Sequence, residues 1–364
     1  MKPKVAFIGT GGTIASVGTG PLDLQNYGAT GKVMHADEII ARFPETALVA
    51  EVLPVRYRNV PSTAIDVSDW KALVLLCEKL ASENPDLAGI VIGHGTATLE
   101  ETAYFLNLTL KIDLPVVLVG AQRPSSALST DAGLNLVNAI RVAASPEARG
   151  MGVLVLLNDE IQAAREATKT STLRLQTFRS RDFGVLGHAD GDAIAFYRRP
   201  IRRCYPDTEF DIRALDAVPR VDIAYAYAGG DGTAVRAFTT AGAKGIVSAG
   251  FAPGFAPPSE FEALKEAVAQ GIVVVQCTRA GSGRTFRGSR LANAGFLIAD
   301  NLIPQKARIL LSLALTVTSD QEDRAHVPHL LVFFFVIQTC GASASGHHAF
   351  EEVSDDPSRV DLGA

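Results

Sequence analysis

Short runs of consecutive apolar residues alternate with stretches of helical spacing, and this alternation limits what the chain can fold into. Strands buried on both faces of a parallel sheet read as such continuous apolar runs. The runs are residues 5–8, 89–92, 116–119 and 153–157. Between them, residues 70–81 and 99–110 carry apolar residues three and four positions apart, which favours helices that cover a sheet. The pattern predicts an α/β fold with a doubly wound, mostly parallel sheet.

A second alternation of the same kind begins near Val221. Its apolar runs start at Val221, Gly245 and Gly271, and stretches of helical spacing separate them. Residues 198–219, between the two alternations, are rich in charge and proline and lack periodicity, which is typical of a linker. We therefore predict an N-terminal domain over residues 1–197, a linker over 198–219, a smaller C-terminal α/β domain over 220–322 and an atypical tail over 323–364.

Composition excludes several classes of partner. A chain of 364 residues that is 47% hydrophobic and 20% charged matches a globular protein of about two domains. Its formal net charge of -5 gives no basis for binding nucleic acid or an anionic membrane. The apolar run at 5–8 is too short for a signal peptide, and the run at 330–337 is far below the roughly 20 residues of a membrane-spanning helix. We predict a cytoplasmic protein with a small-molecule partner.

The cysteines and histidines suggest no metal site. The four cysteines lie far apart and form no Cys-x-x-Cys pair, so we expect reduced, mostly buried thiols. They are Cys77, Cys204, Cys277 and Cys340. His94 has no second histidine at metal-binding spacing, which favours a packed histidine at a strand end. The prediction is a protein without a bound metal.

Polar segments follow four consecutive predicted strands. These segments read GTGGTIAS, GHGTATLEET, GAQRPSSALSTDAG and NDEIQAAREATKTST. They carry Thr13, Thr96, Ser125 with Asp131, and Lys169. Ligands of open parallel sheets bind outside the carboxyl ends of the strands, so we expect these side chains to converge. Arg123 and Asp131 are interpreted as a pair that holds its loop.

The glycines of GTGGT have two interpretations. A phosphate cradle would use their bare N–H groups, but the segment lacks the P-loop pattern, and its match to a dinucleotide fingerprint fails at the third glycine, around Ile14 and Ala15. Alternatively, the glycines leave the hydroxyl of Thr13 uncovered beside N–H groups that hold an oxyanion. We favour the second interpretation and predict no cofactor.

Five segments together resemble the bacterial-type L-asparaginase and glutaminase family in order and spacing. They are GTGGTIAS, IGHGTATLEETAYFL, VVLVGAQRPSSALSTDAGLNL, REATKTST and IPQKARILL. The resemblance covers about residues 4–318. It implies hydrolysis of a side-chain amide, L-asparagine to L-aspartate and ammonia. It also implies a homotetramer, a dimer of dimers, with each active site between the N-terminal domain of one subunit and the C-terminal domain of its partner.

The resemblance also implies roles for single residues. Thr13 corresponds to the nucleophile, on a mobile loop that also holds Tyr27. Thr96 and Lys169 correspond to the second threonine and the lysine that activate the nucleophile or a water molecule. The resemblance implies that Ser62 binds the substrate carboxylate and that Ala121 lies near the leaving amide. The substrate-binding positions that it implies are Thr10, Ser62, Thr63, Gly95, Ala97 and Ala121.

Elementary chemistry agrees with these roles but leaves alternatives open. A threonine hydroxyl requires a nearby base, and Lys169 can be that base only if burial lowers its pKa. Alternatively, Lys169 is a solvated lysine at a helix start. Thr96 can equally be a strand-end hydroxyl before a helix whose Thr98 and Glu101 fit a capping box. Glu100 and Glu101 are interpreted as first-turn acids stabilised by the helix dipole.

The chain departs from the family pattern where the substrate's α-ammonium group binds. Ala97 stands in place of an aspartate and Thr63 in place of a glutamine. The partner subunit's glutamate is also missing, and the position aligned with it is Gly288. The same segment instead contains four arginines, at 279, 284, 287 and 290, which are either anion-binding or solvated.

These departures suggest a change of substrate. An α-ammonium group in a partly dry pocket requires acidic partners, because an unpaired buried charge costs several kcal/mol. Our hypothesis is an amidohydrolase whose preferred substrate lacks a free α-amino group. The alternative is a catalytically weak small-molecule binder or sensor on the same fold.

Overall fold

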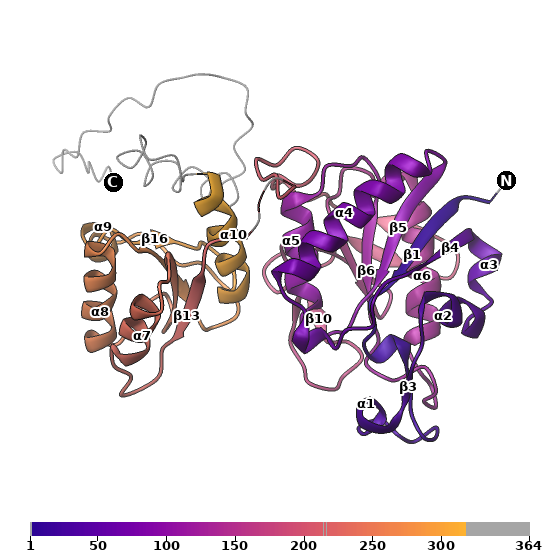
Figure 1. The fold of residues 1–364 in the computed structure, drawn as a ribbon, viewed down its shortest axis with the longest axis horizontal. Coiled ribbons are helices and arrows are strands. Elements are labelled where there is room, and N and C mark those ends of the chain that lie inside the picture. The colour runs from indigo at the N-terminus through magenta and orange to yellow at the C-terminus, as the bar shows by residue number, and fades with distance from the viewer. Residues whose placement is uncertain (1, 214, 216, 318–364) are drawn as a thin grey trace, which may run out of the picture.

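The computed structural model describes residues 2–213, 215 and 217–317, and two separate sheets organise them (Figure 1). The predicted tail over 323–364, with its apolar run and Cys340, lies outside the described residues. Across the described part of the chain, no helix combines the length and apolar content that crossing a membrane requires.

The larger sheet has eight strands in the order β12-β11-β8-β7-β6-β5-β1-β4. The five strands from β7 to β4 are parallel, whereas β8, β11 and β12 form an antiparallel edge. The strands are β1 (Lys4–Gly9), β4 (Glu51–Arg56), β5 (Leu87–Gly93), β6 (Val116–Val119), β7 (Leu154–Leu157), β8 (Glu160–Ala163), β11 (Gly187–Ala189) and β12 (Ile194–Phe196). The predicted α/β fold with a mostly parallel sheet is confirmed.

The antiparallel edge was not predicted, although a local signal for it exists. Asn158 and Asp159, between β7 and β8, have φ angles of 53° and 63°. Two successive residues with positive φ form the tight turn of a β-hairpin, and Asn and Asp tolerate this conformation. The chain therefore reverses at the end of β7 instead of entering a helix.

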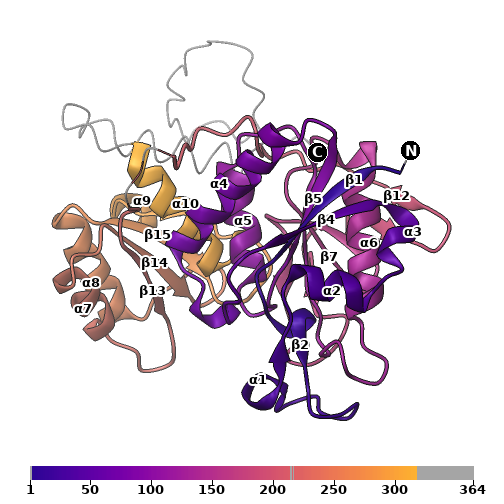
Figure 2. The same cartoon turned by 45° about the vertical axis from the view of Figure 1, so that its right-hand side comes forward.

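Helices cover both faces of the larger sheet (Figures 1 and 2). Ala6 of β1 belongs to a core with α4 (Val67–Glu83) and α5 (Leu99–Thr109), which are the helices predicted at 70–81 and 99–110. Phe7 faces the opposite core, which includes α2 (Ala36–Arg42) and α6 (Ala132–Ala144). Short α3 (Thr46–Val49) and η3 (Pro146–Ala148) both contact α6. Successive residues of one strand thus enter different cores, as a doubly wound sheet requires.

The smaller sheet is parallel and has the order β13-β14-β15-β16. Its strands are β13 (Val221–Tyr225), β14 (Gly245–Gly250), β15 (Val273–Thr278) and β16 (Leu297–Ile298). One face packs on α7 (Thr233–Thr240), α8 (Pro258–Ala269) and α9 (Ser289–Asn293), and the other on α10 (Pro304–Val317). α10 also contacts α5, so one hydrophobic core runs through both domains (Figure 2).

Two small ribbons complete the fold. β2 (Ser16–Val17) pairs with β3 (Lys32–Val33) in an arm that also carries α1 (Tyr27–Thr30) and projects from the larger domain (Figure 1). β9 (Thr168–Lys169) pairs with β10 (Phe178–Arg179). Two one-turn helices, η1 (Thr13–Ala15) and η2 (Ser62–Ala64), follow β1 and β4.

Candidate active site

The loops after β1 and β5 touch through two glycines. Gly12 has a φ of +82°, and a Cβ atom added to it would lie 2.3 Å from the Cα of Gly95. A side chain at residue 12 is therefore excluded both by its backbone conformation and by its neighbour. Thr13 follows Gly12 and Thr96 follows Gly95, so both threonines stand one residue from this contact. The predicted convergence of Thr13 and Thr96 on one edge of the sheet agrees with this arrangement.

Thr10 anchors the start of the loop after β1 through hydrogen bonds. Its backbone N–H and its hydroxyl each donate a hydrogen bond of 3.0 Å to the carbonyl oxygen of Gly93, at the end of β5. Its own carbonyl accepts a hydrogen bond of 2.9 Å from the backbone N–H of Val60. Three adjacent strand ends, those of β4, β1 and β5, are thus tied together at the buried Thr10.

Ser62 brings the segment after β4 to the same place. A Cβ atom on Gly95 would lie 2.6 Å from the Oγ of Ser62. The hydroxyl of Thr98 donates a hydrogen bond of 2.7 Å to the carbonyl oxygen of Ser62. The predicted capping box of Thr98 and Glu101 is therefore wrong, because the Thr98 side chain binds a neighbouring loop instead of the N-terminus of α5.

Thr13 and Tyr27 meet as predicted for residues of one loop. The Oγ1 atom of Thr13 lies 2.8 Å from the hydroxyl oxygen of Tyr27, and either group can donate. Both side chains are half-buried. The pairing of β2 with β3 brings the arm back toward η1, so the tyrosine reaches the threonine across the ribbon.

Lys169 lies against Thr96. Its Nζ donates a hydrogen bond of 2.7 Å to Oγ1 of Thr96, which is only 6% exposed. The alternative of a solvated lysine at a helix start is wrong, because Lys169 is half-buried and lies in β9. Burial lowers the pKa of the Lys169 amine, and the negative charge of Glu100 partly opposes this shift.

Glu100 is a residue of this cluster that the sequence analysis did not identify. Its carboxylate accepts a hydrogen bond of 2.5 Å from the backbone N–H of Lys169 and one of 2.6 Å from Nε2 of Gln305. It is 6% exposed. The position of Glu100 in the first turn of α5 explained its charge, but only the tertiary structure brings Lys169 and Gln305 to it.

His94 is a packed histidine, as predicted, and its tautomer follows from its partners. Its Nδ1 lies 2.8 Å from the carbonyl oxygen of Gly95, which can only accept, so Nδ1 carries the proton. Trp70 donates to the hydroxyl of Thr102, which in turn donates to Nε2 of His94 over 3.0 Å. Burial lowers the pKa of His94 to about 4. A neutral imidazole therefore orients the carbonyl group that precedes Thr96.

The loop after β6 closes over Thr96 from the other side. A Cβ atom on Gly120 would lie 2.9 Å from the methyl group of Thr96, and the adjacent Ala121 is buried. Asp131 accepts hydrogen bonds from the backbone N–H groups of Gln122 and Arg123, both at 2.9 Å. Arg123 and Asp131 thus pair through the backbone N–H of Arg123, and the carboxylate of Asp131 holds the loop.

The positions that depart from the family pattern lie at the surface of this region. Thr63 and Ala97 are both exposed. In the C-terminal domain, Arg279 lies 4.7 Å over the ring of Phe251, Arg290 lies over the ring of Phe261, and Arg284 forms an ion pair with an aspartate. These three guanidinium groups thus have partners within their own domain.

The residues described contain neither a reactive thiol nor a cluster of metal ligands. Burial raises the pKa of Cys77 and of Cys277 to about 12 and that of the half-buried Cys204 to about 11, so all three remain protonated near neutral pH. No group of three His, Cys, Asp or Glu side chains within the described ranges is arranged to hold a metal ion.

Comparisons with known proteins show the family of the chain. Residues 4–202 match the family model "Asparaginase, N-terminal", and residues 220–327 match "Glutaminase/Asparaginase C-terminal domain". L-asparaginase 2 of Bacillus subtilis is 43% identical over 324 residues, which cover 88% of this chain and 84% of that protein. L-asparaginase 2 of Escherichia coli is 39% identical and covers 88% of this chain and 91% of its own length.

A solved structure gives the same result. The crystal structure of a probable cytoplasmic L-asparaginase from Campylobacter jejuni superposes with a TM-score of 0.85 at 39% identity. The match covers 92% of this chain and 99% of that one. The chain belongs to the asparaginase family of amidohydrolases.

Proposed function

We propose that the protein hydrolyses the side-chain amide of L-asparagine to L-aspartate and ammonia, with Thr13 as the nucleophile. The observation that carries the proposal is the contact of Gly12 with Gly95, which brings together the pair of Thr13 with Tyr27 and the pair of Thr96 with Lys169. A hydroxyl with a hydrogen-bonding partner, near a second hydroxyl bound to a half-buried amine, has the parts that nucleophilic catalysis requires.

The proposed reaction has two steps. In the first, Oγ1 of Thr13 attacks the amide carbon, the carbon–nitrogen bond breaks, and the proton of Thr13 leaves with the nitrogen as ammonia. An ester of Thr13 remains. In the second step, water attacks this ester and restores the hydroxyl of Thr13. The backbone N–H groups of the glycine segment stabilise the oxyanion in both steps.

Lys169 acts as the base of this mechanism through Thr96. An amine accepts a proton only in its neutral form, and the burial that lowers the pKa of Lys169 increases the neutral fraction at a given pH. The hydroxyl of Thr96 relays the proton between the reacting atoms and Nζ of Lys169. Tyr27 orients Oγ1 of Thr13 through their hydrogen bond.

The substrate is held by the loops that surround these residues. We assign the α-carboxylate to Ser62 and Gly95, which lie in contact, and the departing amide to the backbone of Ala121. Thr10 anchors the start of the loop after β1, because its hydroxyl donates a hydrogen bond to the carbonyl oxygen of Gly93. Thr63 and Ala97 face the remaining part of the substrate.

Ala97 supports a second candidate, a preference for amides without a free α-ammonium group. It is exposed next to Thr96 and offers a methyl group where an ammonium group would require a carboxylate. Succinamate, which is asparagine without its α-amino group, would then be a better substrate than L-asparagine. A weak binder or sensor is the further alternative.

Ammonia release from L-asparagine and from succinamate tests these proposals. The wild-type protein is expected to release ammonia, and Thr13→Ala to lose at least about 10³-fold in kcat, because no other group replaces the nucleophile. Equal activity of the two proteins would contradict the role of Thr13. Binding of either amide by calorimetry without any ammonia release would establish the binder instead.

The assembly and location are further proposals. We propose a homotetramer built from two dimers, with the C-terminal domain of the partner closing each active site, in the cytoplasm. The domains are proposed as residues 1–197 and 220–322, joined by 198–219. Light scattering of the purified protein measures the assembly, and a monomeric mass with full activity would refute it.

A further inference from the structure

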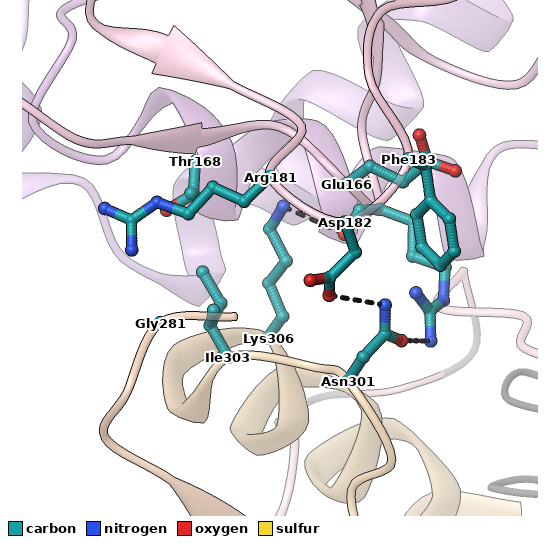
Figure 3. A pocket seen from close by; sticks show the side chains of 10 residues that line it. Glu166, Thr168, Arg181, Asp182, Phe183, Gly281, Asn301, Ile303 and Lys306 are labelled. Atoms are coloured by element: carbon teal, nitrogen blue, oxygen red, sulfur yellow. Dashed lines mark hydrogen bonds between the residues drawn. The ribbon is translucent and has the colours of Figure 1, made fainter. Parts of the chain in front are cut away.

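The first turn of α10 reaches from the small domain into the large one through a buried lysine (Figure 3). Lys306 is 1% exposed, and its Nζ donates hydrogen bonds to the carbonyl oxygens of Ala164 at 2.7 Å, Arg165 at 3.1 Å and Ala167 at 2.5 Å. All three acceptors precede β9 by a few residues. The ammonium group therefore holds the segment that leads into Lys169.

Gln305, next to Lys306 in α10, is connected to the same segment through Glu100. Gln305 donates from Nε2 to one carboxylate oxygen of Glu100 over 2.6 Å, and the other oxygen accepts the backbone N–H of Lys169 over 2.5 Å. Glu100 is thus a bridge between the small domain and the backbone of the lysine that contacts Thr96.

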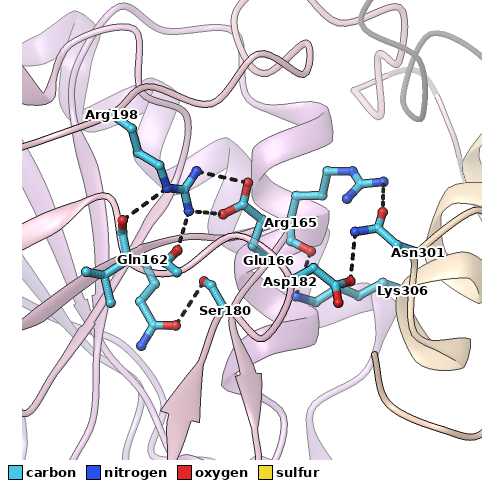
Figure 4. Close-up of polar contacts among 10 residues, drawn as sticks. Gln162, Arg165, Glu166, Ser180, Asp182, Arg198, Asn301 and Lys306 are labelled. Atoms are coloured by element: carbon cyan, nitrogen blue, oxygen red, sulfur yellow. Dashed lines mark hydrogen bonds and ion pairs between the residues drawn. The ribbon is translucent and has the colours of Figure 1, made fainter. Parts of the chain in front are cut away.

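Asn301, just before α10, adds a third connection (Figure 4). It accepts a hydrogen bond of 2.9 Å from Arg165 and donates one of 3.1 Å to the carboxylate of Asp182. The cavity left between the domains here has a volume of about 20 Å³, room for about one water molecule. Residues 164–167, the segment before β9, are therefore held at a closely packed contact between the two domains.

The burial of Lys306 costs free energy, and this cost indicates that the lysine has a function. Burial of an ammonium group is unfavourable, and it lowers the pKa of Lys306 to about 8 even though three carbonyl oxygens surround the group. An apolar side chain would join the two domains without this cost. A buried cation with three directional partners instead fixes the backbone of residues 164–167 in one geometry.

We propose that Gln305 and Lys306 of the small domain are positioning residues for Lys169, with Glu100 as the link. This inference rests on the proposed role of Lys169 in amide hydrolysis. Glu100 accepts the backbone N–H of Lys169 and at the same time places a negative charge beside its amine. Gln305 holds Glu100 in the orientation that makes both effects possible.

The charges around this link determine what a substitution does. The charge of Glu100 acts on Lys169 and opposes the effect of burial on the pKa of Lys169. Besides burial, Glu100, Glu101, Glu166 and Arg165 act on the pKa of Lys306, and Arg308, Glu100 and Lys306 act on that of Glu101. Replacement of Glu100 by glutamine keeps the shape and removes the charge that opposes the fall in the pKa of Lys169. The pKa of Lys169 then falls further, so its neutral form persists to lower pH.

Kinetics of three variants test the proposal. Glu100→Gln is expected to shift the acidic limb of kcat/KM to lower pH and to lower kcat by roughly 10-fold, since small displacements of a catalytic group are costly. Gln305→Leu is expected to lower kcat by a similar factor with KM within about 2-fold, because it frees Glu100 without touching the substrate. Glu101→Gln is the matched control, expected to leave the pH profile unchanged.

Two outcomes of the kinetics would overturn the proposal. One is an unchanged pH profile and full kcat in both Glu100→Gln and Gln305→Leu. The other is an equal pH shift in Glu100→Gln and Glu101→Gln, which would indicate a general effect of charge. The melting temperature of each variant, measured alongside, separates a local displacement from partial unfolding.

A readout without catalysis separates this proposal from the proposed function. In protein labelled with ¹³C at the lysine Cε, the signal absent from Lys169→Met reports the titration of Lys169. Its midpoint is expected to fall in Glu100→Gln and to stay in Glu101→Gln. If the wild type released no ammonia but this midpoint moved as expected, the positioning role would stand while the proposed function would fail. An unmoved midpoint would refute the positioning role alone.

Discussion

The Nζ atom of Lys169 lies 2.7 Å from Oγ1 of Thr96, and the two residues are 73 positions apart in the sequence. The contact joins the strand end of β5 to the β9–β10 ribbon, and no helix or strand contains both partners. A single hydrogen bond contributes only modestly to stability, so this geometry depends on the segments behind each residue. Single and double substitutions can therefore test whether Thr96 and Lys169 act together.

We expect Thr96→Val and Lys169→Met to act on the same step. Each substitution removes one half of the proton relay and is expected to lower kcat by about 10²- to 10⁴-fold. The double variant is expected to lose little more than the worse single variant, because residues that act as a unit are not additive. Ammonia release measures all three.

Thr109→Val is the matched control for this cycle. Thr109 is equally buried, but its hydroxyl donates to the carbonyl of Phe105 within α5. Its kcat is expected to remain close to the wild-type value. Fully additive losses in the double variant would mean that Thr96 and Lys169 act independently, against the proposed relay.

Gly12→Ala is expected to destabilise the protein and abolish activity. The added Cβ would lie 2.3 Å from the Cα of Gly95, in a backbone conformation that side chains rarely adopt. Strain and overpacking of this kind cost roughly 2–4 kcal/mol of the free energy of unfolding. Urea unfolding measures the loss. Gly20→Ala, where nothing lies within 4 Å of the added atom, is the control and should unfold like the wild type.

His94 is expected to make the protein sensitive to acid. Its folded pKa of about 4 lies below the ordinary value of 6.5, so the unfolded chain binds the proton first. Stability is therefore full above about pH 6.5 and decreases as the pH falls toward 4, by up to about 3 kcal/mol from this residue. Unfolding measured between pH 7 and 4 records the slope.

His94→Asn separates this titration from the packing of the histidine. Asparagine can donate to the carbonyl of Gly95 but does not titrate. The variant is expected to be less stable at pH 7, since its contact with Thr102 is lost, and to depend less steeply on pH. An unchanged slope would show that other groups cause the sensitivity to acid.

Ala97→Asp is expected to change the preference between two substrates. A carboxylate at this exposed position pairs with an α-ammonium group, and a close charge pair of this kind contributes about 1–3 kcal/mol. The ratio of kcat/KM for L-asparagine to that for succinamate is therefore expected to rise by roughly 10-fold or more. Ala97→Asn is the uncharged control. An equal change in both variants would attribute the effect to shape instead of charge.

The sequence predicted the elements that follow strong local patterns. The apolar runs around Val5, Ile90 and Val117 are strands because each is buried on both faces, and the resulting order of strand ends brings Thr13 near Thr96. Lys169 was predicted from its segment after a strand end, and its role from the resemblance to a family. Tyr27 was predicted from the resemblance alone, since no local pattern marks it as part of a site.

Other parts of the site depend on contacts between distant residues. Thr98 had the local pattern of a helix cap, in which its hydroxyl would accept a hydrogen bond from the backbone of α5. In the structure the hydroxyl instead donates to the carbonyl of Ser62, which packing brings next to it. Glu100 was explained by its own helix, while the two donors that it binds, at Lys169 and Gln305, come from other segments. Hydrogen bonds of this kind follow from tertiary packing, which a periodicity does not encode.

The position of α10 in the chain has a consequence for how activity arises during synthesis. The large sheet is complete at Phe196, whereas α10 begins at Pro304. Because domains fold in order as the chain leaves the ribosome, the strands that carry both threonines assemble while the small domain is still being made. Gln305 cannot hold Glu100 until α10 docks, so under the proposed positioning role we expect the folded large domain of a nascent chain to be inactive.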